Sequence, residues 1–156
     1  MSQSEETLKS LKNAISELID KFGEKIVAVG LFGSHARGEA DERSDVDILV
    51  IVRDWPRSLR RRFLLYDVLS RHIKKDITLV DVDLCVARQI LRGETKLTSA
   101  MLNILYDCIV LHDPKGVLSE LVSAVRKFVK DKGLIRYRVG RAYGWMRADG
   151  KPMIER

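Results

Sequence analysis

Two short apolar runs, residues 26–32 and 46–52, stand out in the pattern of hydrophobic and polar positions along the chain. Both are rich in β-branched residues, and a polar segment that opens with a Gly-Ser pair separates them. This pattern predicts two strands joined by a turn and a short helix capped by Ser34. A further strand is predicted over residues 76–81. Residues 108–111 form either a short strand or the end of a helix.

Helices are predicted where apolar residues recur every three or four positions. One such stripe spans residues 8–22. A second follows Pro56, which suits the first turn of a helix. We expect its apolar side chains to lie together on one face: Leu59, Phe63, Tyr66, Leu69 and Ile73. The remaining helices are expected over residues 84–92, 97–106 and 113–133, the last one starting at an Asp-Pro pair.

Residues 135–139 and 142–146 alternate between apolar or aromatic and polar or small side chains, which predicts a hairpin that turns at Gly140. Helices interleave with strands throughout, and a short connection rather than a long crossover joins the first two strands. The sequence therefore predicts an α+β fold, with a mixed, partly antiparallel sheet flanked by helices and a C-terminal helical segment followed by a basic hairpin.

The formal net charge of +6 is concentrated at the C-terminal end, where residues 126–156 hold ten Lys and Arg against three Asp and Glu. Such a basic end can bind nucleic acid, an acidic partner or nucleotide phosphates, or it can be a solvated face. The same two interpretations, an anion-facing surface or a solvated face, apply to the arginines near the start of the second helix: Arg57, Arg60, Arg61 and Arg62.

The chain has no apolar run near the ~20 residues that a membrane span needs, and its first residues are polar and acidic. Cys85 and Cys108 lie in apolar surroundings, so we expect small core residues rather than a disulfide or a metal pair. These features favour a cytoplasmic protein without a membrane segment.

Asp45 and Asp47 stand at the start of the second predicted strand. Residues i and i+2 of a strand point to the same face, so these two carboxylates should lie side by side. Their mutual repulsion is costly unless a cation lies between them. Oxygen ligands of this kind suit Mg²⁺, which takes one or two carboxylates together with substrate phosphates.

The segment around this pair resembles the signature of the minimal nucleotidyltransferases, small members of the DNA polymerase β-like nucleotidyltransferase superfamily. Their pattern is Gly-Ser-x-Ala-Arg-Gly, five residues, then Ser-Asp-x-Asp-[Leu/Ile]-x-Val. Every fixed position is met here, by Gly33, Ser34, Ala36, Arg37, Gly38, Ser44, Asp45, Asp47, Ile48 and Val50. The resemblance implies the fold of that superfamily, with a nucleotidyltransferase core over residues 1–95 and a C-terminal extension over residues 96–156 packed on the same domain.

The resemblance also implies a chemistry with two Mg²⁺ ions held by three carboxylates. Asp45 and Asp47 supply two of them, and Asp76 is the preferred third, also as general base for the acceptor hydroxyl. Asp81 and Asp83 stay alternatives, because one sequence does not fix the strand register.

The same resemblance implies that Gly33 and Ser34 hold the β- and γ-phosphates of a nucleoside triphosphate. Arg37 either pairs with a phosphate or locks the loop to an acid such as Asp45. Ser44 completes the expected nucleotide-binding set and should fix the turn before the second strand. His35 occupies the variable position of the motif and is expected to be a loop residue. Near the C-terminus, the aromatic side chains of Tyr143 and Trp145 could stack on a base or pack in the core.

The leading functional hypothesis is a Mg²⁺-dependent transfer of a nucleotide, AMP from ATP, to an acceptor hydroxyl with release of pyrophosphate. Some family members act as antitoxins that modify a HEPN-type toxin. The HEPN signature is absent here, so such a toxin would be another polypeptide. The alternatives are transfer to a small hydroxylated molecule, or a non-catalytic module that neutralises a partner by binding. The sequence leaves the acceptor, the base preference and the oligomeric state open.

Overall fold

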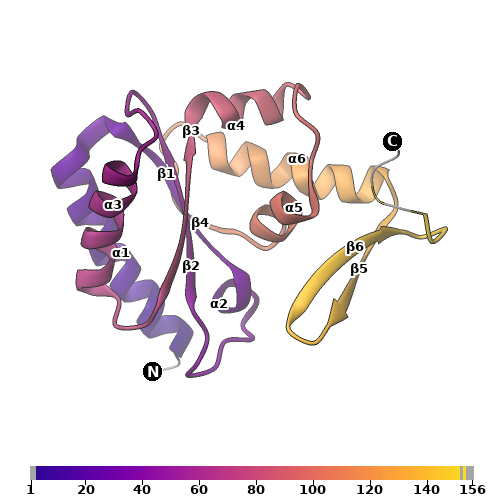
Figure 1. Cartoon of the computed structure of the whole chain (residues 1–156), viewed down its shortest axis with the longest axis horizontal. Helices are drawn as coiled ribbons and strands as arrows, with labels where there is room; N and C mark the ends of the chain where they lie inside the picture. The colour runs from indigo at the N-terminus through magenta and orange to yellow at the C-terminus, as the bar shows by residue number, and fades with distance from the viewer. Residues whose placement is uncertain (1–2, 152, 154–156) are drawn as a thin grey trace.

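A computed structural model describes residues 3–151 and 153, and its centre is a four-stranded sheet (Figure 1). The strand order is β3-β2-β1-β4. β1 (Ile26–Phe32) runs antiparallel to both β2 (Val46–Val52) and β4 (Ile109–His112), whereas β3 (Ile77–Asp83) runs parallel to β2. The predicted mixed, partly antiparallel sheet is thus confirmed.

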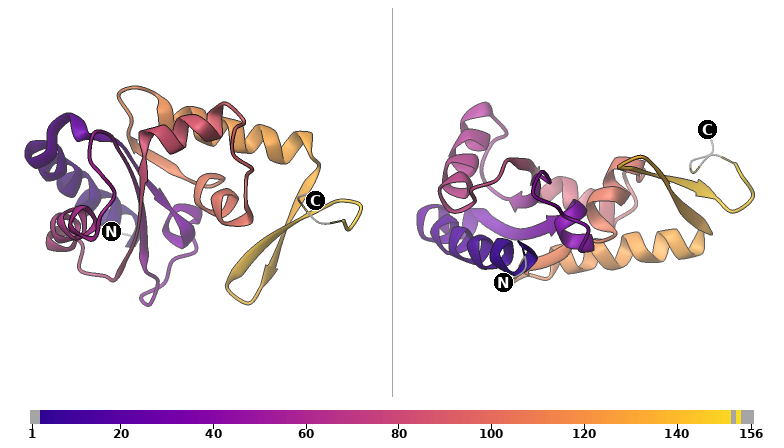
Figure 2. Two further views of the ribbon diagram at one scale, coloured as in Figure 1. Left: turned by 45° about the horizontal axis from the view of Figure 1, so that its top comes forward. Right: turned by 90° about the horizontal axis from the view of Figure 1, so that it is seen from below.

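Helices cover both faces of this sheet (Figures 1 and 2). α1 (Gln3–Phe22) and α3 (Leu59–His72) pack on one face. The opposite face carries α4 (Leu84–Leu91), α5 (Ser99–Leu105) and α6 (Val117–Asp131). Two short helical segments adjoin β1, namely η1 (Gly23–Lys25) before it and α2 (Gly33–Arg37) after it.

Alternation along β2 divides the core into two layers. Val46, Ile48 and Val50 pack with the α1–α3 layer, whereas Leu49 and Ile51 pack with the α4–α6 layer. Side chains two residues apart share a face, so the odd-numbered positions of β2 all point toward α4–α6. Because α5 and α6 bury side chains against β1 and β2, the helical part of the C-terminal extension lies on the sheet itself. The boundary between residues 95 and 96 stays a prediction.

The C-terminal hairpin forms as expected and makes a separate two-stranded sheet. β5 (Leu134–Val139) pairs antiparallel with β6 (Ala142–Arg147), and Gly140 takes a positive φ of 62° in the turn. Leu134 and Trp145 are buried in the α4–α6 layer, so the hairpin is tied to the core at the end where it leaves α6.

The face of α3 that points to the core differs from the predicted one. The helix begins at Leu59 with Ser58 as its N-cap, so Pro56 precedes it. Leu59, Phe63 and Tyr66 are 86%, 64% and 41% exposed. Leu69 and Ile73 are buried as predicted, and the rest of the buried face consists of Arg61, Leu65 and Val68.

Arg61 explains why this face of α3 is the buried one. Its side chain is fully buried, with Nε 2.9 Å from Asp81 Oδ2 and Nη1 2.6 Å from Asp83 Oδ1. Nη1 also donates to the carbonyl of Trp55 at 2.7 Å. A buried guanidinium is tolerated when carboxylates and carbonyls compensate its charge. For Arg61, both the solvated-face and the anion-facing interpretations were therefore wrong.

Two smaller predictions also need correction. α6 begins at Val117, and Asp113 caps it from a distance through the amides of Leu118 and Ser119. Cys108 is buried, and burial raises the pKa of its thiol to about 12, but Cys85 is exposed rather than a core residue. Over residues 3–151 and 153, no helix is both long and apolar enough to cross a membrane.

Candidate active site

A cleft of about 530 Å³ opens where β1 ends and β2 begins. β1 and β2 are neighbours, with Phe32 opposite Asp47, so the start of α2 lies directly beside the paired aspartates. The cleft is lined by Ser34, Arg37, Glu39, Asp41, Arg43, Ser44, Asp45, Asp47, Arg138, Arg141 and Tyr143. All but three of these residues come from the segment that carries the sequence motif.

Gly33 lies against the carboxylate of Asp47. Its φ is +73°, a conformation that favours glycine, and a Cβ placed there would overlap Asp47 Oδ2. α2 starts at Gly33 with Phe32 as the N-cap, and no side chain caps it. The predicted capping role of Ser34 was therefore wrong. Ser34 lies in the first turn of α2 and lines the cleft.

Asp47 carries a destabilised charge. Burial raises the pKa of its carboxyl, and the neighbouring charge of Asp45 raises it further, while a hydrogen bond from Thr78 and the charge of Arg37 oppose this shift. The Thr78 hydroxyl also donates to Asp45 Oδ2 at 3.4 Å. An ionised pair of this kind gains stability from a cation, so the donor set fits a hard divalent ion.

Thr78 is a site residue that sequence reasoning missed. It pairs with Asp47 across the parallel β2–β3 ladder, in a register that no local pattern reveals.

The register of β3 separates the candidates for the third carboxylate. Val46 pairs with Ile77, and the Val46 amide donates to the Asp76 carbonyl at 2.8 Å, so Asp76 lies level with Asp45 and on the same face. The side chains of Asp81 and Asp83 point to the opposite face of the sheet, toward α3, where Arg61 binds both.

The Asp76 side chain is exposed and does not line the cleft. Among the described residues, no three His, Cys, Asp or Glu side chains are gathered closely enough to hold a metal ion. Asp76 therefore shares the face and level of the pair without completing a three-carboxylate group in this conformation.

Arg37 contacts Glu39 rather than Asp45. Its Nε donates to Glu39 Oε1 at 2.9 Å, and its guanidinium lies 4.5 Å from the ring centre of Tyr143. Ser44 forms the expected turn, because its Oγ accepts from the Asp41 amide at 3.0 Å while its own amide donates to the Asp41 carbonyl. Glu39 was missed because its other partners, Arg138 and Tyr143, lie about a hundred residues further along the chain.

The C-terminal hairpin supplies the other wall of the cleft. The Tyr143 hydroxyl donates to Glu39, with oxygen–oxygen distances of 2.9 and 2.8 Å. Arg138 lies 3.4 Å from Glu39, and Arg141 lies 3.7 Å from Asp41. Trp145 takes the core position, packed edge-to-face against Tyr106 and donating to Asn103 Oδ1 at 2.8 Å.

His35 is a buried residue of α2, not a loop residue. Its ring is 2% exposed, and burial lowers its pKa. A backbone hydrogen bond with Ser44 opposes this shift of the pKa. Its side chain does not line the cleft, so it is placed behind the site rather than in it.

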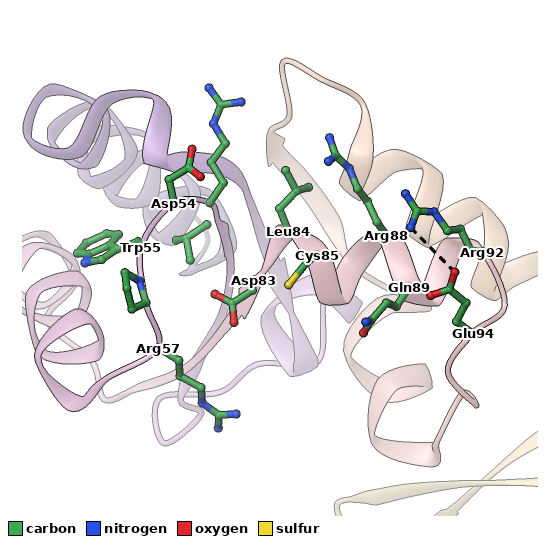
Figure 3. Close-up of a pocket in the computed structure, with 13 residues that line it drawn as sticks. Asp54, Trp55, Arg57, Asp83, Leu84, Cys85, Arg88, Gln89, Arg92 and Glu94 are labelled. Carbon is green, nitrogen blue, oxygen red and sulfur yellow. Dashed lines mark ion pairs between the residues drawn. The ribbon is translucent and has the colours of Figure 1, made fainter.

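A larger hollow of about 760 Å³ lies at the opposite end of β2 and β3 (Figure 3). One wall is α4 with Cys85, Arg88 and Arg92, and the other is the segment with Asp54 and Trp55. Several of its charges are already engaged, since Arg92 pairs with Glu94 and Asp83 with Arg61. Chemistry rather than size therefore selects the cleft at Asp45 and Asp47 as the candidate active site.

Known proteins share sequence and fold with this chain. The family model "Polymerase beta, Nucleotidyltransferase" matches residues 13–101. MJ1305 of Methanocaldococcus jannaschii, provisionally named a protein adenylyltransferase, is 41% identical over 70 residues, which are 42% of this chain and 48% of that protein. The protein adenylyltransferase MntA of Thermococcus cleftensis is 41% identical over 58 residues, or 35% of this chain and 57% of MntA. The chain thus spans about half the length of these relatives.

Among solved structures, one chain of a toxin–antitoxin crystal structure with AMP-PNP superposes with a TM-score of 0.52. The two chains are 21% identical, and the match covers 77% of this chain and 87% of the other. At this identity the likeness shows a shared fold.

Proposed function

This chain belongs to the polymerase β nucleotidyltransferase family, and from that premise we propose that it transfers AMP from ATP to an acceptor hydroxyl. The observation that carries the proposal is the cleft lined by Ser34, Asp45 and Asp47, with Gly33 lying against the Asp47 carboxylate. These are the motif positions at which the family binds and transfers a nucleotide. The names of two relatives, both protein adenylyltransferases, support AMP as the transferred group.

The three carboxylates share one task in this proposal, and Asp76 has a second. Asp45, Asp47 and Asp76 would hold Mg²⁺, with two ions implied by the family resemblance. The ions would neutralise charge on the phosphoryl oxygens and orient the triphosphate. The acceptor oxygen attacks the α-phosphorus, the α–β anhydride bond breaks and pyrophosphate leaves. Asp76, exposed and level with Asp45, takes the proton of the acceptor hydroxyl.

Gly33 and Ser34 hold the phosphate end of the nucleotide. The absence of a side chain at Gly33 leaves room for the Asp47 carboxylate and for close approach of a phosphate to the backbone. Ser34 offers a hydroxyl donor inside the cleft. Arg37 and Ser44 shape the same wall through Glu39 and Asp41, so they position the loop on which the nucleotide rests.

The proposed acceptor is a hydroxyl of a HEPN-type partner protein. Support comes from the fold shared with a chain of a toxin–antitoxin structure and from relatives whose names specify protein as the substrate.

The test uses α-labelled ATP, Mg²⁺, the purified protein and a soluble extract of its source organism. We expect label on one protein band, lost in Asp47→Asn and retained in Asp20→Asn, an exposed aspartate of α1. Label found only in RNA or small molecules would overturn the protein acceptor but keep the transfer chemistry. If none of the four nucleoside triphosphates gives any label, the enzymatic proposal is overturned in favour of a binding module.

A second pair of variants tests the third carboxylate. Asp76→Asn should fold normally and lose transfer, because Asp76 is exposed and its side chain has no structural partner among the described residues. Asp81→Asn should lose stability but keep transfer in its folded fraction, because Asp81 binds Arg61 on the other face of the sheet. The reverse result would assign the role to Asp81.

A further inference from the structure

The C-terminal hairpin has a fixed base and an exposed, charged tip. At the base, Arg136 binds both carboxylate oxygens of Asp107, and its guanidinium lies 5.1 Å from the ring centre of Trp145. Asn103 of α5 accepts from Trp145 and donates to the Tyr143 carbonyl at 3.1 Å. These contacts hold the hairpin at a defined angle to the sheet, with its turn directed toward the segment after α2 (Figure 1).

The tip carries two arginines whose side chains are 55% and 77% exposed, Arg138 and Arg141. Each reaches one carboxylate of the cleft, Glu39 at 3.4 Å and Asp41 at 3.7 Å. Exposed ion pairs at such distances contribute little to stability, so the guanidiniums can exchange these carboxylates for a stronger anion at small cost.

Tyr143 connects the tip to the motif loop. Its hydroxyl bonds Glu39, and Arg37 lies over its ring while also donating to Glu39. These contacts therefore join the motif wall of the cleft to the hairpin wall, through residues about a hundred positions apart in the sequence.

The size and charge of the cleft indicate which ligand the tip would meet. A volume of about 530 Å³ is that of a small-molecule site rather than of a polymer groove. Four arginines line it, namely Arg37, Arg43, Arg138 and Arg141, together with the four carboxylates of Glu39, Asp41, Asp45 and Asp47. Guanidinium groups recognise phosphates through paired hydrogen bonds, and the terminal phosphates of a triphosphate concentrate the most negative charge in the proposed substrate.

We propose that the hairpin tip is part of the nucleotide site, and that Arg138 and Arg141 leave Glu39 and Asp41 to bind the terminal phosphates of the triphosphate. This inference rests on the proposed function and extends it. The chain would close its nucleotide site with a segment that lies outside the matched family region, residues 13–101.

Calorimetric titration tests this proposal with ATP, AMP and inorganic tripolyphosphate as separate probes, each with Mg²⁺. We expect Arg138→Ala/Arg141→Ala to bind ATP and tripolyphosphate at least about tenfold more weakly than the parent, with AMP affinity unchanged. Arg138→Lys/Arg141→Lys should recover part of the loss, because it keeps the charge but not the fork. The matched control is Arg57→Ala/Arg60→Ala, which removes the same charge from exposed arginines near the other end of β2.

Unchanged affinity for ATP and tripolyphosphate in the alanine variant, with transfer intact, would overturn the role of the hairpin and leave the proposed function standing. Equal losses for AMP and ATP would also overturn it, because the tip would then act away from the terminal phosphates. A parent protein that binds no triphosphate would overturn both proposals. As an independent readout, ATP but not AMP should protect the bonds after Arg138 and Arg141 from limited trypsin digestion.

Discussion

The carboxylate of Asp47 lies where a side chain at position 33 would be, and it fits there because residue 33 is a glycine. The contact follows from the antiparallel pairing of β1 with β2, which sets Phe32 opposite Asp47 and brings the next residue, Gly33, against the carboxylate. A motif glycine and a motif aspartate, fourteen positions apart, are therefore one structural unit.

Gly33→Ala should reduce nucleotidyl transfer on the order of 100-fold, because the added methyl group must displace Asp47 from its position. Gly38→Ala is the matched control, since Gly38 has nearly the same φ, +74°, with nothing near its Cβ position. Gly38→Ala should lose only about 1–2 kcal/mol of stability from the backbone conformation. Transfer assays and chemical denaturation of both variants give the comparison, and equal activity losses would contradict the Asp47 contact.

Asp47→Asn should stabilise the metal-free protein at neutral pH. It should also lower transfer by more than about 100-fold, because loss of a residue that merely supports a metal ligand already costs up to about that factor. Burial raises the pKa of Asp47, so its folded state holds a proton more tightly than the unfolded state does. The ionised carboxylate therefore lowers stability most above that raised pKa, and the penalty shrinks as the pH falls through it and is gone below the pKa of the unfolded state. The stabilisation should shrink accordingly in acid.

Thermal unfolding at a series of pH values, with and without Mg²⁺, measures this effect. Mg²⁺ should raise the melting temperature of the parent more than that of Asp47→Asn. Asp20→Asn, in an exposed stretch of α1, should follow the parent under all conditions. A melting temperature that drops in Asp47→Asn at neutral pH would count against a destabilised charge at this position.

Arg61→Ala should destabilise the fold by about 3–5 kcal/mol, because it leaves the Asp81 and Asp83 carboxylates without their buried counter-charge. Arg60→Ala, one position away and exposed, should change stability by less than about 0.5 kcal/mol. Denaturant midpoints of the two variants distinguish a buried ion pair from a solvated arginine. A loss below about 1 kcal/mol for Arg61→Ala would contradict the buried position.

The exposed stripe on α3 should tolerate polar residues. Leu59→Ser and Phe63→Ser are each expected to change stability by no more than about 0.5 kcal/mol, since both side chains are mostly in solvent. Leu65→Ala on the buried face should cost about 2–5 kcal/mol. Denaturation of the three variants measures the difference, and a large loss in Phe63→Ser would restore the face that the sequence predicted.

The sequence by itself determined those features that depend on residues close together in the chain. The apolar runs located β1 and β2, the alternation after Gly133 gave the hairpin, and the spacing of the motif placed Asp45 and Asp47 together. Each of these depends on residues within a few positions of one another, so backbone geometry alone connects pattern and structure.

Only the tertiary structure decided which faces and partners prevailed. α3 carries two apolar rows, and the row with Arg61 was buried because carboxylates from β3 compensate its charge. The β2–β3 register set Asp76 and Thr78 beside the motif pair and turned Asp81 away. The angle at which the hairpin leaves the core brought Tyr143 to Glu39. These outcomes depend on contacts between distant segments, whose energies no local pattern of residues contains.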